Sequence, residues 1–371
     1  MTVPRTPPVT YRAAIVGAGG IAGLGILGLH DAEEIGRKKF TASHAGGYRA
    51  TKGIELVAVA DVDQEKLETF GEAWELPPGG RYTDHREMLR EEQPDAVSVA
   101  TPSYLHRDHV VDAAEIAGPD VIWCEKPIAS SVTGGREMIE ACERAGTELL
   151  VNHSFRFTEK LVRLREAIRD GLLGEIHSVH AGFRMELLRN STHVLDTLGW
   201  LLDERVRSVT GYLTGQNEAV DALEADRTVD DVGGGGTLVY GDDTFATVDC
   251  TVPRTPSSML YRLVGSDGKL SLNNDDAEWR YWALEDGSHV ERDHPAVADG
   301  WTWTEDYESA FPNAASHVVE LLDGAAGTRS SGEAALRSLE VIVAMYVSHH
   351  SGGRVDLPLA RPLEDVTITS W

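Results

Sequence analysis

The sequence predicts two fold classes in succession: a doubly wound parallel α/β sheet, followed by an α+β domain with an open, mainly antiparallel sheet. Buried strands that alternate with helices from Tyr11 to about Leu150 indicate the first. Strand-like segments that follow one another after about Val151, with little helix between them, indicate the second. Alternation is typical of parallel sheets, because parallel strands need a helical crossover between them. At 371 residues the chain is long enough for two domains.

The first part contains four predicted strands and one clear helix. Each strand is a short run of small or branched apolar residues, as expected for strands that are buried on both faces. The predicted strands are Ala13–Val16, Ile54–Ala60, Ala96–Ala100 and the apolar run from Val121 that ends on Lys126. The helix is predicted over Arg107–Ala117. In such a sheet, ligands bind at the carboxyl ends of the strands.

The second part begins with an amphipathic helix, Thr158–Asp170, which stops at Gly171. The strand-like stretches that follow are Ile176–Arg184, Val206–Thr214, Gly236–Tyr240, Thr244–Val252, Leu260–Val264 and Lys269–Leu272. A closing helix is predicted over Gly332–His349. Strands that succeed each other in this way are typical of a mainly antiparallel sheet.

The surface charge limits the classes of partner. The net charge is −26, and only seven of the 34 basic residues are lysines. An acidic surface that is poor in lysine suits a halophilic protein in molar salt, because salt screens its self-repulsion. An acidic enzyme that works at ordinary salt is the alternative. In both cases nucleic acid is an unfavourable partner for this surface.

The sequence also bears on location and metals. No apolar run approaches the roughly 20 residues that span a bilayer, so we expect no membrane association. The first twelve residues lack the apolar core of a signal peptide, and we expect a cytoplasmic protein. Cys124, Cys142 and Cys250 have no metal-ligand spacing, and their odd number suits a reducing compartment. No metal site is predicted.

A glycine-rich turn follows the first strand and predicts a nucleotide site. It reads Gly17-x-Gly19-x-x-Ala22, with Gly20 and Ile21 as the last two variable residues. The first glycine permits a tight turn, the second lets the backbone approach a pyrophosphate, and the small alanine allows close packing of helix on strand. We expect a helix to open at this turn, with its N-terminus towards the phosphates.

The next strand ends on Asp61, where a carboxylate can accept hydrogen bonds from both hydroxyls of a ribose. No arginine follows at Val62 or Asp63 to bind a 2′-phosphate. The sequence therefore predicts a Rossmann domain that binds NAD in preference to NADP. Asp61 lies 44 positions after Gly17, against the usual gap of about 20, which indicates an insertion within about 24–42.

The strand that ends on Lys126 predicts a proton-transfer group. Pro127 disfavours the helical region for the residue before it, so the lysine continues the extended chain. It follows the nucleotide motif, where a sheet that binds a nicotinamide cofactor needs such a group. An ordinary surface lysine after a strand is the alternative. This combination indicates a dehydrogenase.

Taken in order, these residues resemble a known family. The matching positions are Gly17-x-Gly19-x-x-Ala22, Asp61, Thr101-Pro102-x-x-x-His106, Glu125-Lys126-Pro127, Arg156-Phe157, His193-x-x-Asp196 and, after a helix, Val355-x-Leu357-Pro358. The chain resembles the Gfo/Idh/MocA oxidoreductases, the family of glucose–fructose oxidoreductase and inositol 2-dehydrogenase. The resemblance extends from about Arg12 to Leu359.

The resemblance implies an NAD(P)-dependent reaction at a carbinol carbon of a sugar, an inositol-like polyol or a sugar acid. The residue pattern predicts a disordered tail over 1–11, a cofactor domain over 12–150 and a second domain over 151–371, and the resemblance implies that the second domain serves substrate binding and oligomerisation. The closing helix at 332–349 can also pack against the first domain. A homodimer or homotetramer is expected from the same resemblance.

Residue roles carry over position by position. The expected cofactor-binding residues are Gly17, Gly19, Gly20, Ile21, Ala22, Asp61, Thr101, Pro102, His106, Glu125 and Lys126. Lys126 and His193 are the expected catalytic pair. A cationic nicotinamide and a shortage of water favour the neutral amine of Lys126, which suits proton transfer. The expected substrate-binding residues are Arg156, Arg189, His193 and Asp196.

Several of these assignments have structural alternatives. His106 is either a residue of the helix start or part of the nicotinamide pocket. Arg156 either contacts substrate or forms a structural salt bridge, and His193 is either the second acid/base group or a packed histidine. His193 and Asp196 are three apart and share a face of a helix that starts near Ser191.

One position departs from the family pattern. The family usually has an aspartate four residues before the histidine, and Arg189 stands there in this chain. A guanidinium cannot act as a base, but it can bind a carboxylate or phosphate in a bidentate manner. We therefore expect Arg189 to select an anionic substrate such as a sugar acid. Glu186 is an alternative source of the missing carboxylate.

Two other functions remain open on the sequence alone. One is a non-catalytic regulator that binds NAD and sugar, which the change at Arg189 favours and the presence of Lys126 with His193 disfavours. The other is a lyase or glycosidase that uses NAD transiently and returns it unchanged. Net reduction of the cofactor separates the dehydrogenase from both.

Overall fold

The computed structural model describes residues 10–25, 42–214, 227–241, 244–253, 259–273, 278–298 and 303–370. Most of the expected tail (1–9) and of the expected insertion (26–41) therefore lies outside the described residues. In the described part of the chain, no helix is long and apolar enough to cross a membrane. The chain forms two compact units, one drawn from Met1–Glu125, Met138–Ser154 and Glu308–Ser331, and the other from Lys126–Glu137, Phe155–Tyr307 and Gly332–Trp371.

The first unit is built on a parallel sheet of six strands in the order β3-β2-β1-β4-β5-β6. The strands are β1 (Tyr11–Val16), β2 (Ile54–Ala60), β3 (Arg81–Tyr82), β4 (Ala96–Val99), β5 (Val121–Cys124) and β6 (Glu148–Val151). All five pairings are parallel, which confirms the predicted fold class. The chain order reverses between β1 and β4, and at such a switch point the carboxyl ends of parallel strands form a ligand-binding crevice.

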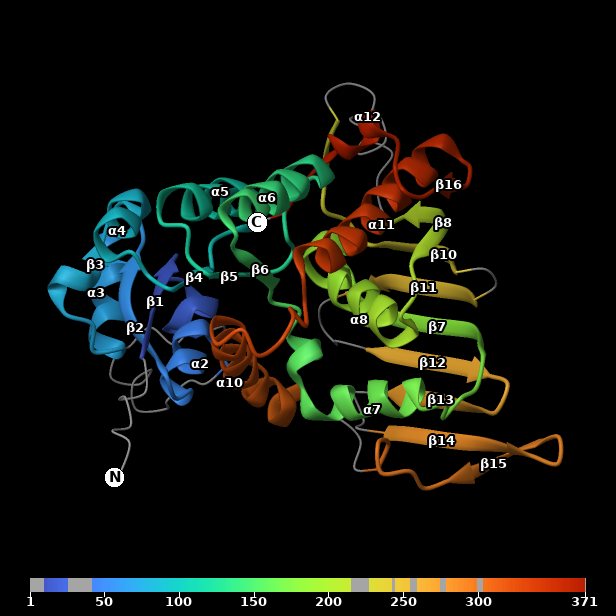
Figure 1. Ribbon diagram of the computed structural model, residues 1–371. Helices are drawn as coiled ribbons and strands as arrows, with labels where there is room; N and C mark the ends of the chain where they lie inside the picture. The colour runs from blue at the N-terminus through green and yellow to red at the C-terminus, as the bar shows by residue number, and fades with distance from the viewer. Residues whose placement is uncertain are drawn as a thin grey trace, which may run out of the picture. The chain divides into compact units, whose positions relative to one another are not determined.

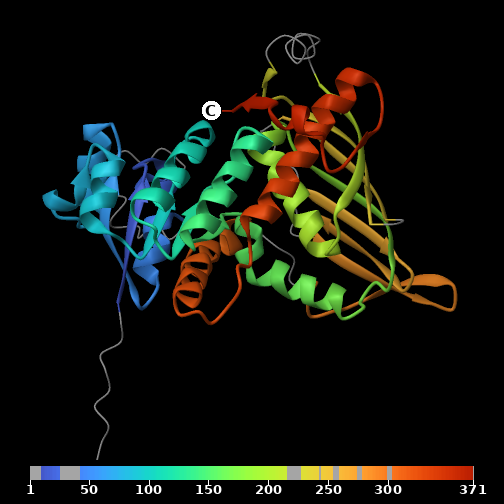
Figure 2. The same ribbon diagram turned by 45° about the horizontal axis from the view of Figure 1, so that its top comes forward.

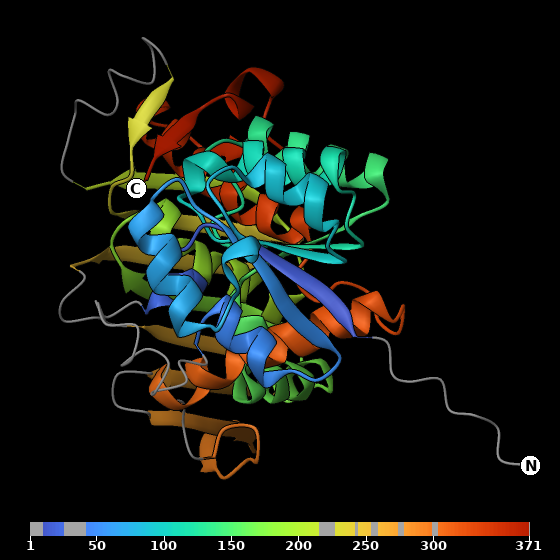
Figure 3. The same cartoon turned by 90° about the vertical axis from the view of Figure 1, so that its left-hand side faces the viewer.

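Helices connect these strands, as Figure 3 shows for the blue and teal part of the chain. They are α2 (His44–Ala50), α3 (Gln64–Ala73), α4 (His85–Glu92), α5 (His106–Ile116) and α6 (Val132–Ala145), with α10 (Trp303–Leu322) later in the chain. Local capping explains the starts of α2 and α3. The side chain of Ser43 accepts a hydrogen bond from the amide of Gly46 before α2, and Asp63 accepts two before α3.

The second unit is built on a mixed sheet of nine strands in the order β15-β14-β13-β12-β7-β11-β10-β8-β16. The strands are β7 (Ile176–Arg184), β8 (Val206–Leu213), β10 (Gly234–Tyr240), β11 (Thr244–Val252), β12 (Leu260–Gly265), β13 (Gly268–Asn273), β14 (Glu278–Glu285), β15 (Ser288–Arg292) and β16 (Val355–Asp356). Only β11 and β7 pair in parallel, so the prediction of a mainly antiparallel sheet is confirmed.

Helices cover one face of this sheet and leave the other open (Figures 1 and 2). They are α7 (Glu159–Arg169), α8 (Thr192–Leu202) and α11 (Gly332–Ser351), and a short α12 (Arg361–Glu364) follows. The helix α11 packs on β8 and α8 of its own unit. It lies so close to β8 that a Cβ on Gly211 would stand 2.7 Å from the Cα of Met345. Tyr212 and Phe245 remain 45% and 48% exposed, which is consistent with an open sheet.

A separate two-stranded parallel sheet joins β9 (Thr228–Asp230) to β17 (Thr367–Thr369). It brings residues near the end of the chain beside a segment that lies about 140 residues earlier. The amide of Ile368 in β17 also donates to the carbonyl of Ser130 at 2.9 Å. The second unit therefore contains a connection between the segment after Lys126 and the segment after β9.

Candidate active site

Gly17 directly follows β1 and has a backbone conformation that only glycine adopts here without strain. Its φ angle is +97°, and a Cβ there would stand 2.8 Å from the carbonyl oxygen of Ala100. Its amide donates to the carbonyl of Ala60 at 2.7 Å. The turn is therefore held between the ends of β2 and β4, where a side chain has no room.

Gly19 differs from Gly17, because nothing in the described protein explains its lack of a side chain. Its φ angle is −81°, and no atom lies within 4 Å of the position that a Cβ would take. The space beside its backbone is open to a ligand, which fits the predicted approach of a pyrophosphate. The predicted helix appears as a five-residue π-helical turn, Gly20–Leu24, in which Ile21 is half-buried and Ala22 is fully buried.

Asp61 ties the end of β2 to the glycine turn. Its carboxylate oxygens accept hydrogen bonds from the amide of Ala18 at 2.7 Å and from the amide of Asp63 at 2.9 Å. A carboxylate offers about four lone-pair positions, so these two bonds leave room for ribose hydroxyls. Val62, which follows it, is 91% exposed. The turn and the acidic residue predicted from the sequence are thus brought together, and they fit the adenosine half of NAD.

The loop after β4 contains Thr101 and Pro102, and it contacts the buried His106 and the half-buried His109. His106 is fully buried, and its Nε2 is 2.8 Å from the carbonyl oxygen of Thr101. It begins α5, so the geometry favours the helix-start alternative for this residue. The Oγ1 of Thr101 is 3.1 Å from Nδ1 of His109. Burial, with the neighbouring His85 and His106, lowers the pKa of His109 to about 4.

Glu125 follows β5 and is buried in a network of polar side chains. Its Oε1 is 3.1 Å from Nε2 of His44 and also accepts a hydrogen bond from the amide of Asn152. The other ring nitrogen of His44 is 2.9 Å from the hydroxyl of Ser98. These partners fix Glu125 within the first unit. No sequence motif identifies them, because they lie in three separate segments of the chain.

Lys126 belongs to the second unit and contacts the segment that precedes the histidine helix. Its Nζ donates to the carbonyl oxygen of Arg189 at 3.1 Å, and the side chain is partly buried. The peptide bond between Lys126 and Pro127 is cis. The backbone is helical from Leu187 to Leu202, first as a π turn over Leu187–Ser191 and then as α8. The π turn therefore continues the helix that carries His193 backward as far as Arg189 and beyond.

His193 lies in the first turn of α8, with 6% of its surface exposed. Its ring stands 4.9 Å from the ring of Phe155 and 6.5 Å from the ring of Phe183, measured between centroids. Aromatic contacts on two sides restrict the orientation of the imidazole. Such restriction suits a group that must present one nitrogen in a fixed direction.

Arg156 and Asp196 are directed at each other. The guanidinium donates to both carboxylate oxygens, at 2.7 Å each, and both residues are buried. The ring of Trp200, one turn further along α8, has its centroid 5.7 Å from the guanidinium carbon of Arg156. Of the two alternatives for Arg156, the geometry favours the structural salt bridge.

Glu186 precedes the π turn with a φ angle of +75°. One of its carboxylate oxygens accepts a hydrogen bond from the side-chain amide of Asn190 at 2.9 Å. The start of the turn is also held by Asp231, which follows β9, because its carboxylate accepts hydrogen bonds from the amides of Leu188 and Arg189. Asp231 carries no motif in the sequence, since its partners lie more than 40 positions away.

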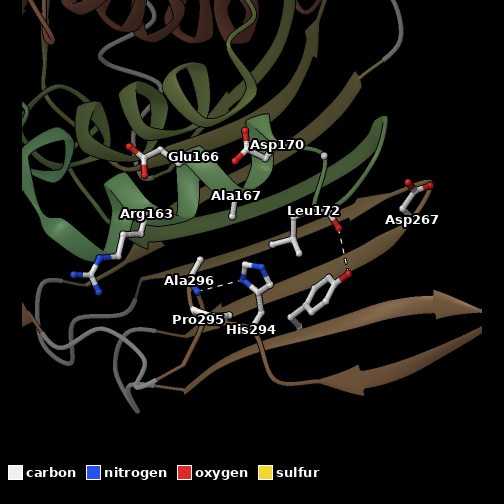
Figure 4. Close-up of a pocket in the computed structure, with 11 residues that line it drawn as sticks. Arg163, Glu166, Ala167, Asp170, Leu172, Asp267, His294, Pro295 and Ala296 are labelled. Carbon is white, nitrogen blue, oxygen red and sulfur yellow. Dashed lines mark hydrogen bonds between the residues drawn. The ribbon is translucent and has the colours of Figure 1, made fainter.

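Outside these motifs, the described residues form a cavity but no metal-binding cluster. Among the described residues, no group of histidine, cysteine and acidic side chains is arranged to hold a metal ion. A cavity of about 690 Å³ lies between α7 and β14 and is lined in part by Asp170, Asp267 and His294 (Figure 4). It contains none of the predicted site residues.

Comparison with known proteins agrees with this geometry. A family described as an oxidoreductase family with an NAD-binding Rossmann fold matches residues 11–153, and its C-terminal α/β domain matches residues 181–357. A D-apiose dehydrogenase of Paraburkholderia graminis is 29% identical over 360 residues, covering 91% of this chain and 92% of that protein.

Solved structures show the same fold. The WlbA dehydrogenase of Bordetella pertussis, in complex with NADH and UDP-GlcNAcA, has a TM-score of 0.74 at 23% identity and covers 95% of this chain and 99% of that one. An oxidoreductase of Agrobacterium radiobacter, in complex with NAD+, L-tartaric acid and magnesium, has a TM-score of 0.73 at 20% identity, with 94% and 98% covered. Together with the family matches over both parts of the sequence, these findings confirm the predicted resemblance. The chain belongs to the Gfo/Idh/MocA family of oxidoreductases.

Proposed function

We propose that the protein is an NAD-dependent dehydrogenase that acts on a carbinol carbon of a sugar, a polyol or a sugar acid. The observation that carries the proposal is the contact of Lys126 Nζ with the carbonyl of Arg189, immediately before the helix that holds His193. An amine and an imidazole, both partly withdrawn from water, are suited to acid–base chemistry on a hydroxyl. The D-apiose dehydrogenase relative supports a sugar as substrate.

The cofactor assignment rests on the turn after β1 and on Asp61. The open space at Gly19 fits a pyrophosphate, and the remaining lone pairs of Asp61 fit an adenosine ribose. We propose NAD over NADP, because a 2′-phosphate would meet the negative charge of this carboxylate with no arginine at the next two positions. When bound, the nicotinamide supplies the site that accepts or donates a hydride.

The side chains of the second unit manage the proton. In oxidation, the neutral amine of Lys126 takes the proton of the substrate hydroxyl at Nζ while the carbon gives up its hydride. In reduction, the ammonium returns that proton to the forming hydroxyl. His193 orients the hydroxyl or exchanges the proton with Lys126. Arg156 and Asp196 act on this step only by fixing the first turns of α8.

Arg189 adds a proposal about substrate charge. Its guanidinium stands where the family usually has a carboxylate, and it is permanently cationic. We propose that it binds the carboxylate of a sugar acid. Arg189→Ala should then raise KM more for acids than for neutral sugars of the same size, by roughly tenfold if one charge-assisted hydrogen-bond pair is lost. Equal effects on both classes would rule the idea out.

Further parts of the proposal concern the protein as a whole. We propose a cofactor domain over 12–150 and a substrate and oligomerisation domain over 151–371, with assembly into a homodimer or homotetramer in the cytoplasm. The exposed side chains on the open sheet face support a role of that face in assembly. The charge of −26 with seven lysines supports function in molar salt, so dialysis against dilute buffer should reduce activity.

The decisive test is nicotinamide absorbance over time in molar potassium chloride, with NAD or NADP and a panel of aldoses, polyols and sugar acids. Formation of NADH with one substrate class, lost in Lys126→Ala, would support the dehydrogenase. A bound cofactor without turnover would favour the regulator instead. Conversion of substrate without net NADH would favour a redox-neutral reaction, and product analysis by chromatography separates these two outcomes.

A further inference from the structure

Asp231 holds the backbone that receives the ammonium of Lys126. Its two carboxylate oxygens accept hydrogen bonds from the amides of Leu188 and Arg189 at 2.9 and 3.0 Å. The carbonyl oxygen of Arg189 in turn accepts a hydrogen bond from Lys126 Nζ at 3.1 Å. A single residue of the π turn is therefore fixed at its N–H by a carboxylate and at its C=O by the lysine.

The helix beginning at Leu187 needs such a partner from elsewhere. The first amides of a helix have no acceptor within the helix and are usually satisfied by the side chain of the preceding residue. Here the preceding residue, Glu186, provides no such bond. The carbonyl of Val232 accepts the amide of Leu187 at 2.9 Å, and Asp231 accepts the next two. The start of the helix is thus capped by a segment that lies more than 40 residues later.

Asp231 is itself held on both sides. Its amide donates to the carbonyl of Thr369 at 3.1 Å, at the end of the β9–β17 pair. The hydroxyl of Tyr346, from α11, accepts the amide of Val232 at 3.0 Å and donates to the carbonyl just before Asp231. Because Ile368 also binds the carbonyl of Ser130, the C-terminal strand connects Asp231 to the segment that begins at Lys126.

We propose that Asp231 is a positioning residue for Lys126, acting through the peptide groups of Leu188 and Arg189. The inference rests on the proposed function of Lys126 in proton transfer. Its contacts close a ring of hydrogen bonds: from Lys126 to the π turn, from the turn to Asp231, and from Asp231 through β17 back to the lysine segment. A group in such a ring has few alternative positions, which is what a site for proton transfer requires.

The ionisation of Asp231 bears on the strength of this hold. Burial raises the pKa of its carboxyl to about 6, against the opposing effect of the two amide hydrogen bonds. Glu186 adds to the rise through its charge. A side-chain hydrogen bond with Ser370 opposes the rise. Tyr346 and Asp230 are ionisable neighbours of this segment, and Lys126 is linked to it through the peptide group of Arg189. Above about pH 6 the carboxylate binds both amides with its full charge, and below it the bonds weaken.

The test is the reactivity of Lys126 in the full-length protein, compared between Asp231→Asn and the wild type. Asparagine keeps the shape but turns an N–H towards one of the two amides. The lysine then loses a fixed acceptor for its ammonium, and this change favours the reactive neutral amine. Acylation of Lys126 by an amine-specific reagent, followed by peptide mass spectrometry between pH 5 and 9, should be faster by at least about threefold.

A matched control is Asp230→Asn, because the carboxylate of the preceding residue contacts the hydroxyl of Thr369 and neither amide of the turn. It should leave the acylation rate unchanged. In turnover, Asp231→Asn should lower kcat by roughly 10- to 100-fold while the KM for NAD stays within about twofold. The loss should be largest above about pH 6, where the wild-type carboxylate is ionised.

These measurements separate the inference from the proposed function. An unchanged acylation rate in Asp231→Asn, in a variant with a wild-type thermal transition, would overturn the positioning role. If the variant does not fold, Asp231→Glu, which keeps the charge, takes its place. An unchanged acylation rate of Lys126 in that variant, together with lost protection of the 187–191 amides in hydrogen exchange, would also overturn the positioning role. If Lys126 is acylated faster in Asp231→Asn but the wild type reduces no NAD, the positioning role stands and the proposed dehydrogenase activity is rejected.

Discussion

The guanidinium of Arg156 and the carboxylate of Asp196 form a bidentate ion pair inside the second unit, with both N···O distances at 2.7 Å. Their exposed fractions are 7% and 2%, so almost no water reaches either charge. The pair links the segment before α7 to α8, the helix that also carries His193. A contact of this kind sets the position of the histidine without taking part in its chemistry.

Removing one partner should therefore reduce stability more than substrate affinity. Arg156→Ala leaves a buried carboxylate without its guanidinium, and the free energy of unfolding should fall by about 3–5 kcal/mol. Asp196→Ala should cost a similar amount, and the double variant less than the sum, because the lone buried charge is then gone. Urea denaturation at pH 7 measures all three. A variant of normal stability with a raised substrate KM would instead establish Arg156 as a substrate ligand.

The two glycines of the nucleotide turn should behave in opposite ways. Gly17→Ala forces a side chain against Ala100 at a φ angle of +97°, and should cost about 1–3 kcal/mol of stability. Gly19→Ala meets no atom of the described residues within 4 Å, so the fold should keep its melting temperature. The methyl group would occupy the space assigned to the pyrophosphate, and should raise the Kd for NAD by about tenfold, or about 1.4 kcal/mol.

Thermal unfolding and fluorescence titration with NAD check these two variants side by side. Weak NAD binding by a Gly17→Ala protein of normal stability would contradict the steric reason given for that position. Normal NAD binding by Gly19→Ala would show that the open space at this backbone is not used by the cofactor. Either result would require another location for the phosphates.

His109 should contribute to the loss of stability in acid. Burial lowers its pKa to about 4 in the folded state, against about 6.5 in the unfolded chain. The folded state therefore disfavours the protonated imidazole, and the stability that the neutral ring contributes is complete above pH 6.5 and is lost as the pH falls through about 4. The difference over this window is at most about 3 kcal/mol.

The measurement is the free energy of unfolding of His109→Asn and of the wild type, each from pH 4 to pH 8. Asparagine keeps a polar group near the hydroxyl of Thr101 without titrating. The wild type should lose stability relative to the variant as the pH falls. His289→Asn, in an exposed strand, is the control and should follow the wild type at every pH. If the free energy of unfolding changes with pH in the same way for His109→Asn and the wild type, this ring does not titrate as described.

Much of the fold could be predicted because the strands of a buried sheet carry their own signal. The runs at β2, β7 and β11 were predicted with the bounds that the structure has. The hairpin of β14 and β15 was missed, although Asp286 and Gly287 at its turn, both with positive φ, are a recognised hairpin signal. β14 is half-buried and β15 is largely exposed, so their residues lack the apolar pattern that identified the others.

The candidate site was predictable to the extent that its chemistry follows a motif. Gly17, Asp61 and Lys126 each follow a strand, and position in the chain was enough to find them. His44 and Asp231 carry no such signal, because they act on groups 81 and 42 positions away that only the tertiary fold brings near. The family motifs identify Arg156 and Asp196, but their mutual pairing depends on the tertiary fold.

Glu125 should prove to be a structural residue of the first unit. It is 6% exposed, and its Oε1 interacts with the ring of His44 and the amide of Asn152. Glu125→Gln retains an acceptor but removes the charge that strengthens both bonds. The free energy of unfolding should fall by about 1–2 kcal/mol, while the Kd for NAD should change by less than about twofold.

Chemical denaturation and NAD titration of the same protein samples distinguish this role from direct cofactor binding. Glu55→Gln, which removes an exposed carboxylate from β2, is the matched control and should be neutral in both assays. A tenfold weaker NAD affinity with unchanged stability would place Glu125 at the cofactor, as the family resemblance implies. We expect reduced stability with nearly unchanged NAD affinity instead. The buried ring of His44 lies 4.0 Å from the ring of Trp123, so any loosening at Glu125 disturbs the packing beneath β5.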